Sequence, residues 1–395
     1  MLKPDRLLAR WAIALSLAWL AGCAPLRYGD ALLVLGDLAA GEGPSRLKQV
    51  TPEPSRTPVT YTVAGRLRTG DLYLPRDDKP QAGIVLVPGA VPKGKDDVRL
   101  VVFARTLARA RFAVLAPEIR GHRDLRIRAT DAREVADAFS HLASREDLAP
   151  GGRAGIGAFS YAVGPALLAA LEDDVRPRVR FVVGVGGYYD LSRALRFFTT
   201  GYFDDEHGVR RRLEPDEYGK LVFAMSVRDH LGDANDRAIL DRMVAAKLAD
   251  RATGLAPLAA GLTPEGMSVY RLLTNTDPGE FGHLFAALPP ETQATIGALT
   301  LHDKALERLT ARLILVHGKN DTLIPYPESV ALGQAVPPSR ARVFIINRIL
   351  GHVDLALSHI LTRRFWSEEL PDAWRLFRAV DSLLREREAP APWEA

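Results

Sequence analysis

Short apolar runs recur along the chain, and segments with helical periodicity separate them. The runs lie at residues 83–90, 112–117, 155–159, 179–187, 311–318 and 342–346. Runs of this length and uniform apolarity are typical of strands buried on both faces of a parallel sheet. Segments with helical spacing of apolar positions lie at 97–110, 130–144 and 371–386. Strands that alternate with helices in this way predict an α/β protein with a mostly parallel, doubly wound sheet.

Two segments depart from this alternation. Residues 59–63 and 72–74 flank a turn-prone region at 64–71, which predicts an antiparallel hairpin. Residues 191–307 contain few strand-like runs and many polar, helix-compatible stretches, which predicts a mainly helical insertion. The sheet domain is therefore expected in two parts, 59–190 and 308–388, with the insertion as a cap between them.

The first 22 residues predict a targeting segment that stands outside the fold. Lys3, Arg6 and Arg10 precede an apolar run at 11–20, which is well short of the ~20 residues that span a bilayer as a helix. The run ends in the sequence Leu-Ala-Gly followed by Cys23, the single cysteine of the chain. This ending resembles a bacterial lipobox, in which the cysteine becomes the lipidated first residue. An ordinary secretory signal or an uncleaved anchor is the alternative.

The lipobox resemblance implies a signal peptide at 1–22, a lipid anchor at Cys23 and a location at the membrane of a bacterial cell envelope. Ala24 follows the cysteine where Asp would favour the inner membrane, so the outer membrane is expected if the cell has two. Residues 23–58 are predicted to be an N-terminal segment with a short helix at 31–35 that packs on the main domain. Residues 41–58 are rich in Gly, Pro, Ser and Thr and predict a tether without helix or strand.

Composition removes several classes of function. The chain is 47% hydrophobic and 25% charged, and its 52 basic and 48 acidic side chains give a net charge of +4. The densest basic run, 210–212, is too short to indicate nucleic-acid binding. One cysteine excludes an intrachain disulfide and a cysteine-based metal site. Histidines of the insertion show no metal-ligand spacing; they are His207, His230, His283 and His302. Neither a metal nor an organic cofactor is expected.

Candidate chemistry begins at Ser160, which lies between the predicted strand 155–159 and an apolar, helix-compatible segment. A serine in such a turn presents its hydroxyl beside the start of a helix, the arrangement of a nucleophile elbow, usually written G-x-S-x-G. Ala158 and Ala162 stand where that motif has glycine. The turn needs small residues at these two positions, because strand and helix pass close together there. Taken alone, the stretch is equally consistent with an ordinary strand-to-helix turn.

Two later turns add an acid and a histidine. Asp321 follows the strand at 311–318, and His352 follows the strand at 342–346. Loops from separate parallel strands converge at the carboxyl edge of the sheet. Ser160, Asp321 and His352 are therefore expected to meet there, in the order serine, acid, histidine that the α/β-hydrolase triad follows.

Three other polar residues lie near predicted strand ends. Asp190 follows the strand at 179–187 and is the reserve candidate for the acid. His317 is expected to be structural, because it ends a strand beside the acid turn. His122 is expected either at the surface or in the wall of the pocket.

With these turns, residues 59–190 and 308–385 resemble the α/β-hydrolase superfamily, in the broad group of serine esterases, peptidases and dienelactone-hydrolase-like proteins. The resemblance implies that Ser160 is the nucleophile, His352 the general base and Asp321 the acid that orients it. It assigns the oxyanion hole to the backbone N–H of Tyr161 and to that of Ala90 or Val91. A Pro-Gly pair at 88–89 stands where many members carry His-Gly.

The sequence thus predicts a lipid-anchored envelope serine hydrolase that cleaves small-molecule carboxylic esters through an acyl-enzyme. The insertion would cover the site and select the substrate, and no nucleic acid, metal or cofactor would take part. Two alternatives remain open. The same triad could serve acyl transfer or peptide cleavage, or the chain could be a non-catalytic binding or scaffold lipoprotein, for which the paired alanines at 158 and 162 are the support.

Overall fold

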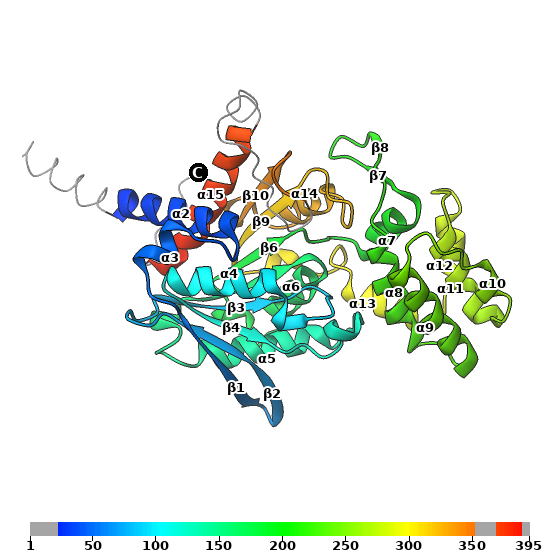
Figure 1. Ribbon diagram of the computed structural model, residues 1–395, viewed down its shortest axis with the longest axis horizontal. Coiled ribbons are helices and arrows are strands. Elements are labelled where there is room, and N and C mark those ends of the chain that lie inside the picture. The colour runs from blue at the N-terminus through cyan, green and yellow to red at the C-terminus, as the bar shows by residue number, and fades with distance from the viewer. Residues whose placement is uncertain (1–22, 352–368, 389–395) are drawn as a thin grey trace, which may run out of the picture.

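The computed structural model describes residues 23–351 and 369–388 (Figure 1). Its centre is an eight-stranded sheet with the order β1-β2-β4-β3-β5-β6-β9-β10. The strands are β1 Ser55–Val63, β2 Arg66–Leu74, β3 Ala82–Val87, β4 Phe112–Pro117, β5 Ala154–Phe159, β6 Phe181–Val185, β9 Arg312–Gly318 and β10 Ala341–Ile346. From β4 to β10 all pairs are parallel, whereas β2 is antiparallel to both β1 and β4. The predicted α/β class with a mostly parallel sheet is confirmed.

Helices cover both faces of the sheet. They are α2 Cys23–Ala40, α3 Arg46–Val50, α4 Val98–Arg109, α5 Asp131–Ala143, α6 Val163–Leu171, α14 Pro327–Gln334 and α15 Leu370–Leu384. Successive strand side chains point to opposite faces. Val85 accordingly belongs to the apolar core beneath α5, α6 and α14, and Ile84 to the core beneath α2, α4 and α15. Burial on both faces explains why the strands are almost uniformly apolar.

The N-terminal hairpin is longer than its hydrophobic pattern predicted. Ala64 and Gly65 form its two-residue turn with φ of 48° and 76°, and positive φ at both positions suits the twist of a hairpin. Residues 66–71, predicted to belong to the turn, therefore pair in β2. Several of their side chains are polar because this end of the hairpin has a solvated face.

The tether predicted at 41–58 is wrong as a description of local structure, because it contains α3 and the start of β1. Ser45 caps α3 by accepting the backbone N–H of Lys48 at 3.1 Å. The Arg109 guanidinium donates to the carbonyls of Thr51 and Pro52, each at 2.9 Å. These bonds to the core order a segment whose composition alone favours disorder.

The short helix expected at 31–35 is longer in the structure, where it forms the whole of α2. It lies beside α15 (Figure 1). Arg27 donates to Asp381 of α15 at 2.6 Å, and Arg387 donates to Asp30 at 2.8 Å. On the side of α4, Thr106 donates to Asp37 at 2.7 Å. Cys23 is the first residue of this docked helix. Within the described ranges, no helix is both long and apolar enough to cross a bilayer.

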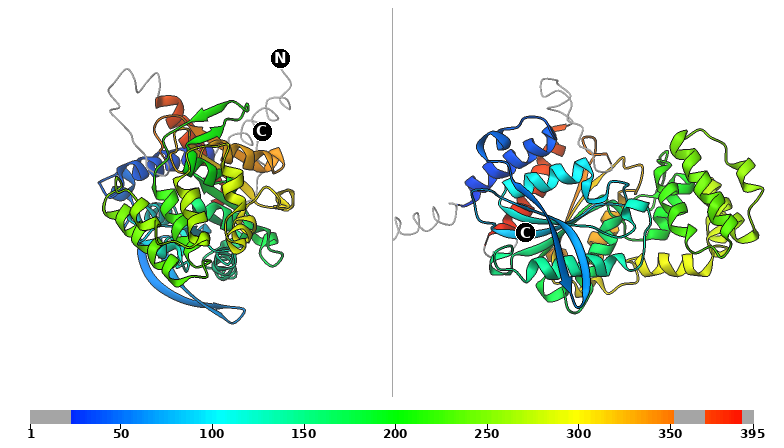
Figure 2. Two further views of the ribbon diagram at one scale, coloured as in Figure 1. Left: turned by 90° about the vertical axis from the view of Figure 1, so that its right-hand side faces the viewer. Right: turned by 60° about the horizontal axis from the view of Figure 1, so that its bottom comes forward.

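Residues 191–307 are mainly helical and gather at the end of the molecule opposite α2 (Figures 1 and 2). Their elements are α7 Leu191–Thr200, β7 Tyr202–Asp204, β8 Arg210–Arg212, α8 Tyr218–Arg228, α9 Ala234–Ala249, α10 Ala256–Ala259, α11 Pro264–Thr274, α12 Phe281–Ala286 and α13 Pro290–Leu299. The short β7-β8 hairpin was not predicted, and the basic run at 210–212 is its exposed second strand. We refer to residues 191–307 as the cap.

Candidate active site

Ser160 occupies a strained turn between β5 and α6. Its φ is 55°, a left-handed value that few residues other than glycine adopt. A short 3₁₀ turn at Ser160–Ala162 then leads directly into α6. Such strain persists where the surrounding structure imposes it, and it is concentrated at functional sites. The structure thus gives Ser160 the conformation expected of an elbow.

Glycines of β6 and of the loop after it make room for this turn, whereas the two motif positions that flank the serine hold alanine. Ala158 pairs in register with Gly184 of β6. A Cβ on Gly184 would lie 2.9 Å from Cγ1 of Val163, and a Cβ on Gly187 would lie 2.6 Å from Cβ of the same valine. The helix after Ser160 therefore approaches β6 closely, although both residues flanking the turn, Ala158 and Ala162, are fully buried alanines.

Ser160 borders a cavity of about 550 Å³ that lies between the carboxyl edge of the sheet and the cap. Most of its walls are apolar. The sheet domain contributes Leu100, Phe103, Ile127, Phe159, Leu323 and Ile324, and the cap contributes Leu191, Leu195, Phe198, Val222, Phe223 and Ile296. A cavity of this size and lining suits a small, largely apolar ligand.

The residues assigned to the oxyanion hole line the same cavity. Ala90 and Val91 lie in the loop after β3, and Tyr161 follows the serine. A Cβ on Gly89 would be 3.4 Å from Cβ of Ser160, so this loop passes directly beside the serine. From the cap, the Tyr218 hydroxyl donates to the Ala90 carbonyl at 2.8 Å. The structure therefore brings Ser160, Tyr161, Ala90 and Val91 together.

Asp321 is fully buried in the turn after β9. Its Oδ1 accepts the backbone N–H groups of Leu323 and Ile324, at 2.7 and 3.0 Å, and both of these residues line the cavity. His317 Nε2 lies 3.2 Å from Asp321 Oδ2 and donates to the Ile324 carbonyl at 2.8 Å. His317 Nδ1 is 2.7 Å from Ser329 Oγ. His317 thus braces the acid turn, in the structural role expected of it.

His352 lies outside the described residues, so the structure does not place it. The chain immediately before it is described. A Cβ on Gly318, at the end of β9, would overlap the carbonyl oxygens of Leu350 and Gly351. The backbone that leads to His352 is therefore packed against the strand end that leads to Asp321.

Asp190, the reserve acid, caps the first helix of the cap. Its Oδ1 accepts the backbone N–H of Ser192 at 2.9 Å and the Ser192 hydroxyl at 2.6 Å. Its Oδ2 lies 3.7 Å from His302 Nδ1. Asp190 does not line the cavity, and the capping of α7 accounts for its position.

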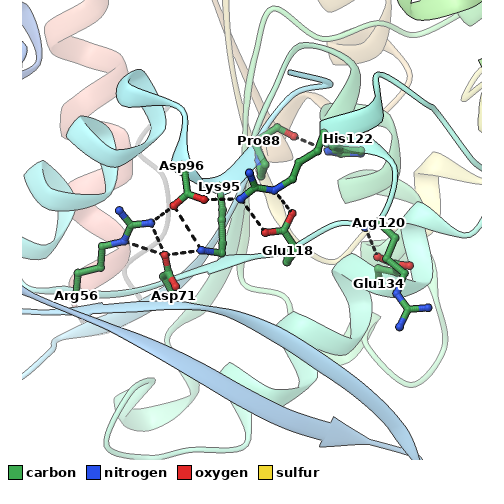
Figure 3. Close-up of polar contacts among 10 residues, drawn as sticks. Arg56, Asp71, Pro88, Lys95, Asp96, Glu118, Arg120, His122 and Glu134 are labelled. Atoms are coloured by element: carbon green, nitrogen blue, oxygen red, sulfur yellow. Dashed lines mark hydrogen bonds and ion pairs between the residues drawn. The ribbon is translucent and has the colours of Figure 1, made fainter. Parts of the chain in front are cut away.

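His122 lies neither at the surface nor in the cavity wall, which corrects both expectations. It is completely buried, and its Nδ1 lies 3.0 Å from the Pro88 carbonyl oxygen (Figure 3). Because a carbonyl only accepts, Nδ1 carries the hydrogen. Its Nε2 lies 3.4 Å from Oδ2 of the buried Asp131, the first residue of α5, which the sequence pattern did not single out.

The loop that contains Ala90 and Val91 leads along the chain to Lys95 and Asp96, which belong to an ionic cluster (Figure 3). The cluster consists of Arg56, Asp71, Lys95, Asp96, Glu118 and Arg123. Partial burial acts against ionisation of Asp96, but hydrogen bonds from Arg123 and Arg56 outweigh it and lower the pKa of Asp96 to about 2. Neither this cluster nor any other part of the described ranges holds a group of three His, Cys, Asp or Glu side chains arranged to bind a metal ion.

No protein-family model and no curated protein matches the sequence. Solved structures do match. A presumed hydrolase from Legionella pneumophila is 14% identical, with 87% of this chain and 95% of that chain covered and a TM-score of 0.52. A 2,6-dihydroxy-pseudo-oxynicotine hydrolase is 13% identical, with 87% and 73% covered and a TM-score of 0.46.

An acylaminoacyl peptidase from Pyrococcus horikoshii also matches, at 12% identity and a TM-score of 0.41. The match covers 77% of this chain but 38% of the peptidase. At sequence identities this low, the likeness shows only how the backbone is arranged. In this chain the backbone forms a mostly parallel eight-stranded sheet with an antiparallel β2 and helices on both faces, and the Legionella hydrolase matches it with a TM-score of 0.52. The chain therefore has the α/β-hydrolase fold, with a helical cap inserted between β6 and β9.

Proposed function

We propose that the protein is a serine hydrolase that cleaves carboxylic esters, with Ser160 as the nucleophile. The observation that carries the proposal is the strained conformation of Ser160 at the wall of an apolar cavity, beside the loop of Ala90 and Val91. Strain in a buried turn has a cost of about 1–3 kcal/mol. A serine that served only to join β5 to α6 would have no need of it.

The proposed reaction proceeds through an acyl-enzyme. A serine hydroxyl is a weak nucleophile at neutral pH, so His352 would take its proton as Ser160 Oγ attacks the ester carbonyl. Asp321 would orient the imidazole and stabilise its cationic form. The C–O bond to the alcohol then breaks, and the alcohol leaves with the proton from His352. Water, deprotonated by the same histidine, releases the acid and restores Ser160.

The oxyanion formed in each step would be stabilised by backbone N–H groups of Tyr161 and of Ala90 or Val91. Loss of one such donor costs roughly 2.7–4 kcal/mol in other serine hydrolases. Tyr161 also lies just before α6, where the helix dipole favours negative charge. No metal is required by this arrangement.

The first test is covalent labelling. A fluorophosphonate should modify the purified protein at Ser160, and Ser160→Ala should abolish both labelling and ester turnover. The melting temperature of the variant, measured in parallel, shows that it is folded. Absence of labelling in folded wild-type protein would contradict the proposal and favour a binding or scaffold role.

The second test concerns the acyl group. Because the cavity walls are mostly apolar, kcat/KM for p-nitrophenyl esters should rise with acyl chain length until the cavity is filled and then fall. Peptide amides and alcohol acceptors are assayed alongside. Faster amide cleavage, or transfer to an alcohol in preference to water, would replace the esterase assignment by peptidase or acyltransferase activity.

We further propose that a lipid on Cys23 anchors the protein to the bacterial envelope, in the outer membrane where there are two. The support is the lipobox-like sequence that ends at the single cysteine of the chain. Cys23→Ser should release the protein from the membrane fraction with ester turnover unchanged. A variant that stays with the membrane would refute the lipid anchor.

A further inference from the structure

Two buried side chains, His122 and Asp131, connect the two backbone segments that carry the proposed oxyanion donors. On one side, His122 Nδ1 donates to the Pro88 carbonyl, two residues before Ala90 (Figure 3). On the other side, the Tyr161 hydroxyl donates to Asp131 Oδ2 at 3.0 Å. His122 Nε2 lies 3.4 Å from the same carboxylate oxygen. The contacts follow one another from the loop after β3 to the residue after Ser160, and the middle one, between His122 Nε2 and Asp131, is close packing without a hydrogen bond.

The packing around this chain of contacts is tight. Both His122 and Asp131 are completely buried. The imidazole ring of His122 meets the Tyr161 ring edge-on, with centroids 5.6 Å apart, and Tyr161 stacks on Tyr188 at 6.2 Å. Burial raises the pKa of Tyr161 well above its usual value, and Asp131 raises it further. Its hydroxyl therefore keeps the proton that it donates to Asp131 near neutral pH.

The loop between these contacts has few anchors of its own. Residues 88–91 are Pro-Gly-Ala-Val, so no side chain in it can form a hydrogen bond. Its position depends on external partners. Beyond Val91, Lys95 and Asp96 are fixed in the ionic cluster, where Asp96 contacts Arg56 and Arg123. Arg123 is the neighbour of His122 in the chain, so one turn after β4 holds both ends of the loop.

We propose that His122 and Asp131 are positioning residues that hold the two sides of the oxyanion hole at a fixed separation. The inference rests on the proposed function of Ser160 and assigns two residues that touch neither the nucleophile nor the substrate. An oxyanion hole works because its donors are in place before charge develops. A displacement of about 1 Å can lower a rate by about 10²-fold. Loss of the donor to the Pro88 carbonyl would leave the start of the loop held, among the described residues, only by the bond from Tyr218 to Ala90, which comes from the cap.

The experiment compares two substitutions of His122. In His122→Asn, the amide nitrogen stands near the position of Nδ1 and can still donate to Pro88, whereas His122→Leu has no donor. His141→Leu is the matched control, because His141 of α5 stacks on Tyr61 away from the cavity. The measurements are kcat and KM for a p-nitrophenyl ester, the rate of fluorophosphonate labelling, the Ki of a boronic acid and the melting temperature.

We expect His122→Leu to lower kcat by about 100-fold, whereas KM should stay within about twofold of the wild-type value. The Ki of the boronic acid should rise by the same factor by which kcat falls. His122→Asn should recover most of the loss, and His141→Leu should keep wild-type kcat. A purely structural role would lower the melting temperature without this division between kcat and KM. Wild-type kcat in folded His122→Leu, or equal losses in the Leu and Asn variants, would overturn the proposal.

Should His122→Leu fail to fold, Tyr161→Phe provides the second test, because it removes only the hydroxyl that donates a hydrogen bond to Asp131. It should lower kcat at unchanged KM, and wild-type kcat would overturn the proposal. If wild-type protein is labelled but cleaves no ester, the esterase assignment fails alone, and labelling rates of the same variants still decide the role of His122. If it is not labelled, both proposals fall.

Discussion

Asp190 and Asp321 look alike in the sequence, since each follows an apolar strand, yet their surroundings differ. Asp190 is partly exposed and spends one oxygen on the first turn of α7. Asp321 is completely buried, and its turn forms part of the cavity wall. At the scale of the residue, the two aspartates thus differ in burial and in whether their turn borders the cavity.

This contrast gives a paired prediction. Asp321→Asn should lower kcat by about 10⁴-fold, the effect of losing the acid in a serine triad, with the fold retained. Asp190→Ala should leave kcat within a few fold and reduce the free energy of unfolding by about 1 kcal/mol, the usual contribution of an N-cap. Ester kinetics and urea denaturation measure both. The reverse pattern would make Asp190 the acid.

Individual site residues differed in how far the sequence could predict them. Ser160 and Asp321 follow strands that the apolar pattern marks clearly, so topology alone brings their loops to one edge. The contacts of His122 and Asp131 have no such signal, because they are made with the Pro88 carbonyl and the Tyr161 hydroxyl. A backbone carbonyl is invisible in a sequence, and a buried aspartate at a helix start looks like any acidic first turn.

At the scale of elements, the approach of α6 to the sheet depends on glycines of β6 and of the loop after it. Gly184 and Gly187 both lie against Val163 of the elbow helix. The room that the turn at Ser160 and the start of α6 need is thus provided in part by glycines of β6 and the loop after it. This explains why a turn flanked by Ala158 and Ala162 still holds Ser160 at positive φ.

Gly184→Ala should therefore destabilise the protein by about 1–3 kcal/mol, the range for overpacking a filled core. Val163→Ala in the same chain should recover part of that loss, because it removes the methyl group that the new Cβ meets. Gly36→Ala in α2 is the control, since a Cβ there meets nothing within 4 Å. It should stabilise the helix by about 0.5–1 kcal/mol. Chemical denaturation measures all four, and additive effects of the first two would contradict the contact.

Elements themselves were predictable where burial dictates the pattern and less so elsewhere. The parallel strands are buried on both faces, so their apolar runs stand out. The segment at 41–58 is ordered by polar bonds to Arg109, which a local pattern does not contain. The β7-β8 hairpin has an exposed strand of three arginines, so it lacks the apolar alternation by which strands are recognised.

For the whole molecule, several carboxylates have a lowered pKa. Burial opposes this shift at Asp137 of α5, but hydrogen bonds from Arg66 and Arg68 of the hairpin hold its pKa below the usual 3.8. A carboxylate with a lower pKa in the folded state stabilises the fold at pH values above the unfolded value. That contribution is lost as the pH falls through the folded value.

The melting temperature should accordingly fall as the pH is lowered from 3.8 toward 2, the range set by Asp96. Asp137→Asn should destabilise the protein near neutral pH by about 2 kcal/mol, because it weakens the charged hydrogen bonds from Arg66 and Arg68. The difference from wild type should shrink at low pH, where the wild-type carboxyl is also neutral. Calorimetry across this range checks the trend, and a constant difference would contradict it.

The docking of α2 against α15 and α4 has a consequence for a protein held at Cys23. An 18-residue helix is roughly 27 Å long. Its salt bridges to the core hold it in one orientation relative to the sheet domain. A lipid on Cys23 would then fix the orientation of the molecule relative to the membrane as well as its location in the cell. The cap lies at the other end of the molecule (Figure 1), so the lipid would hold the cap, and the cavity that it lines, away from the bilayer. Such an enzyme would draw its substrate from the aqueous side, and bilayer lipids would be out of its reach.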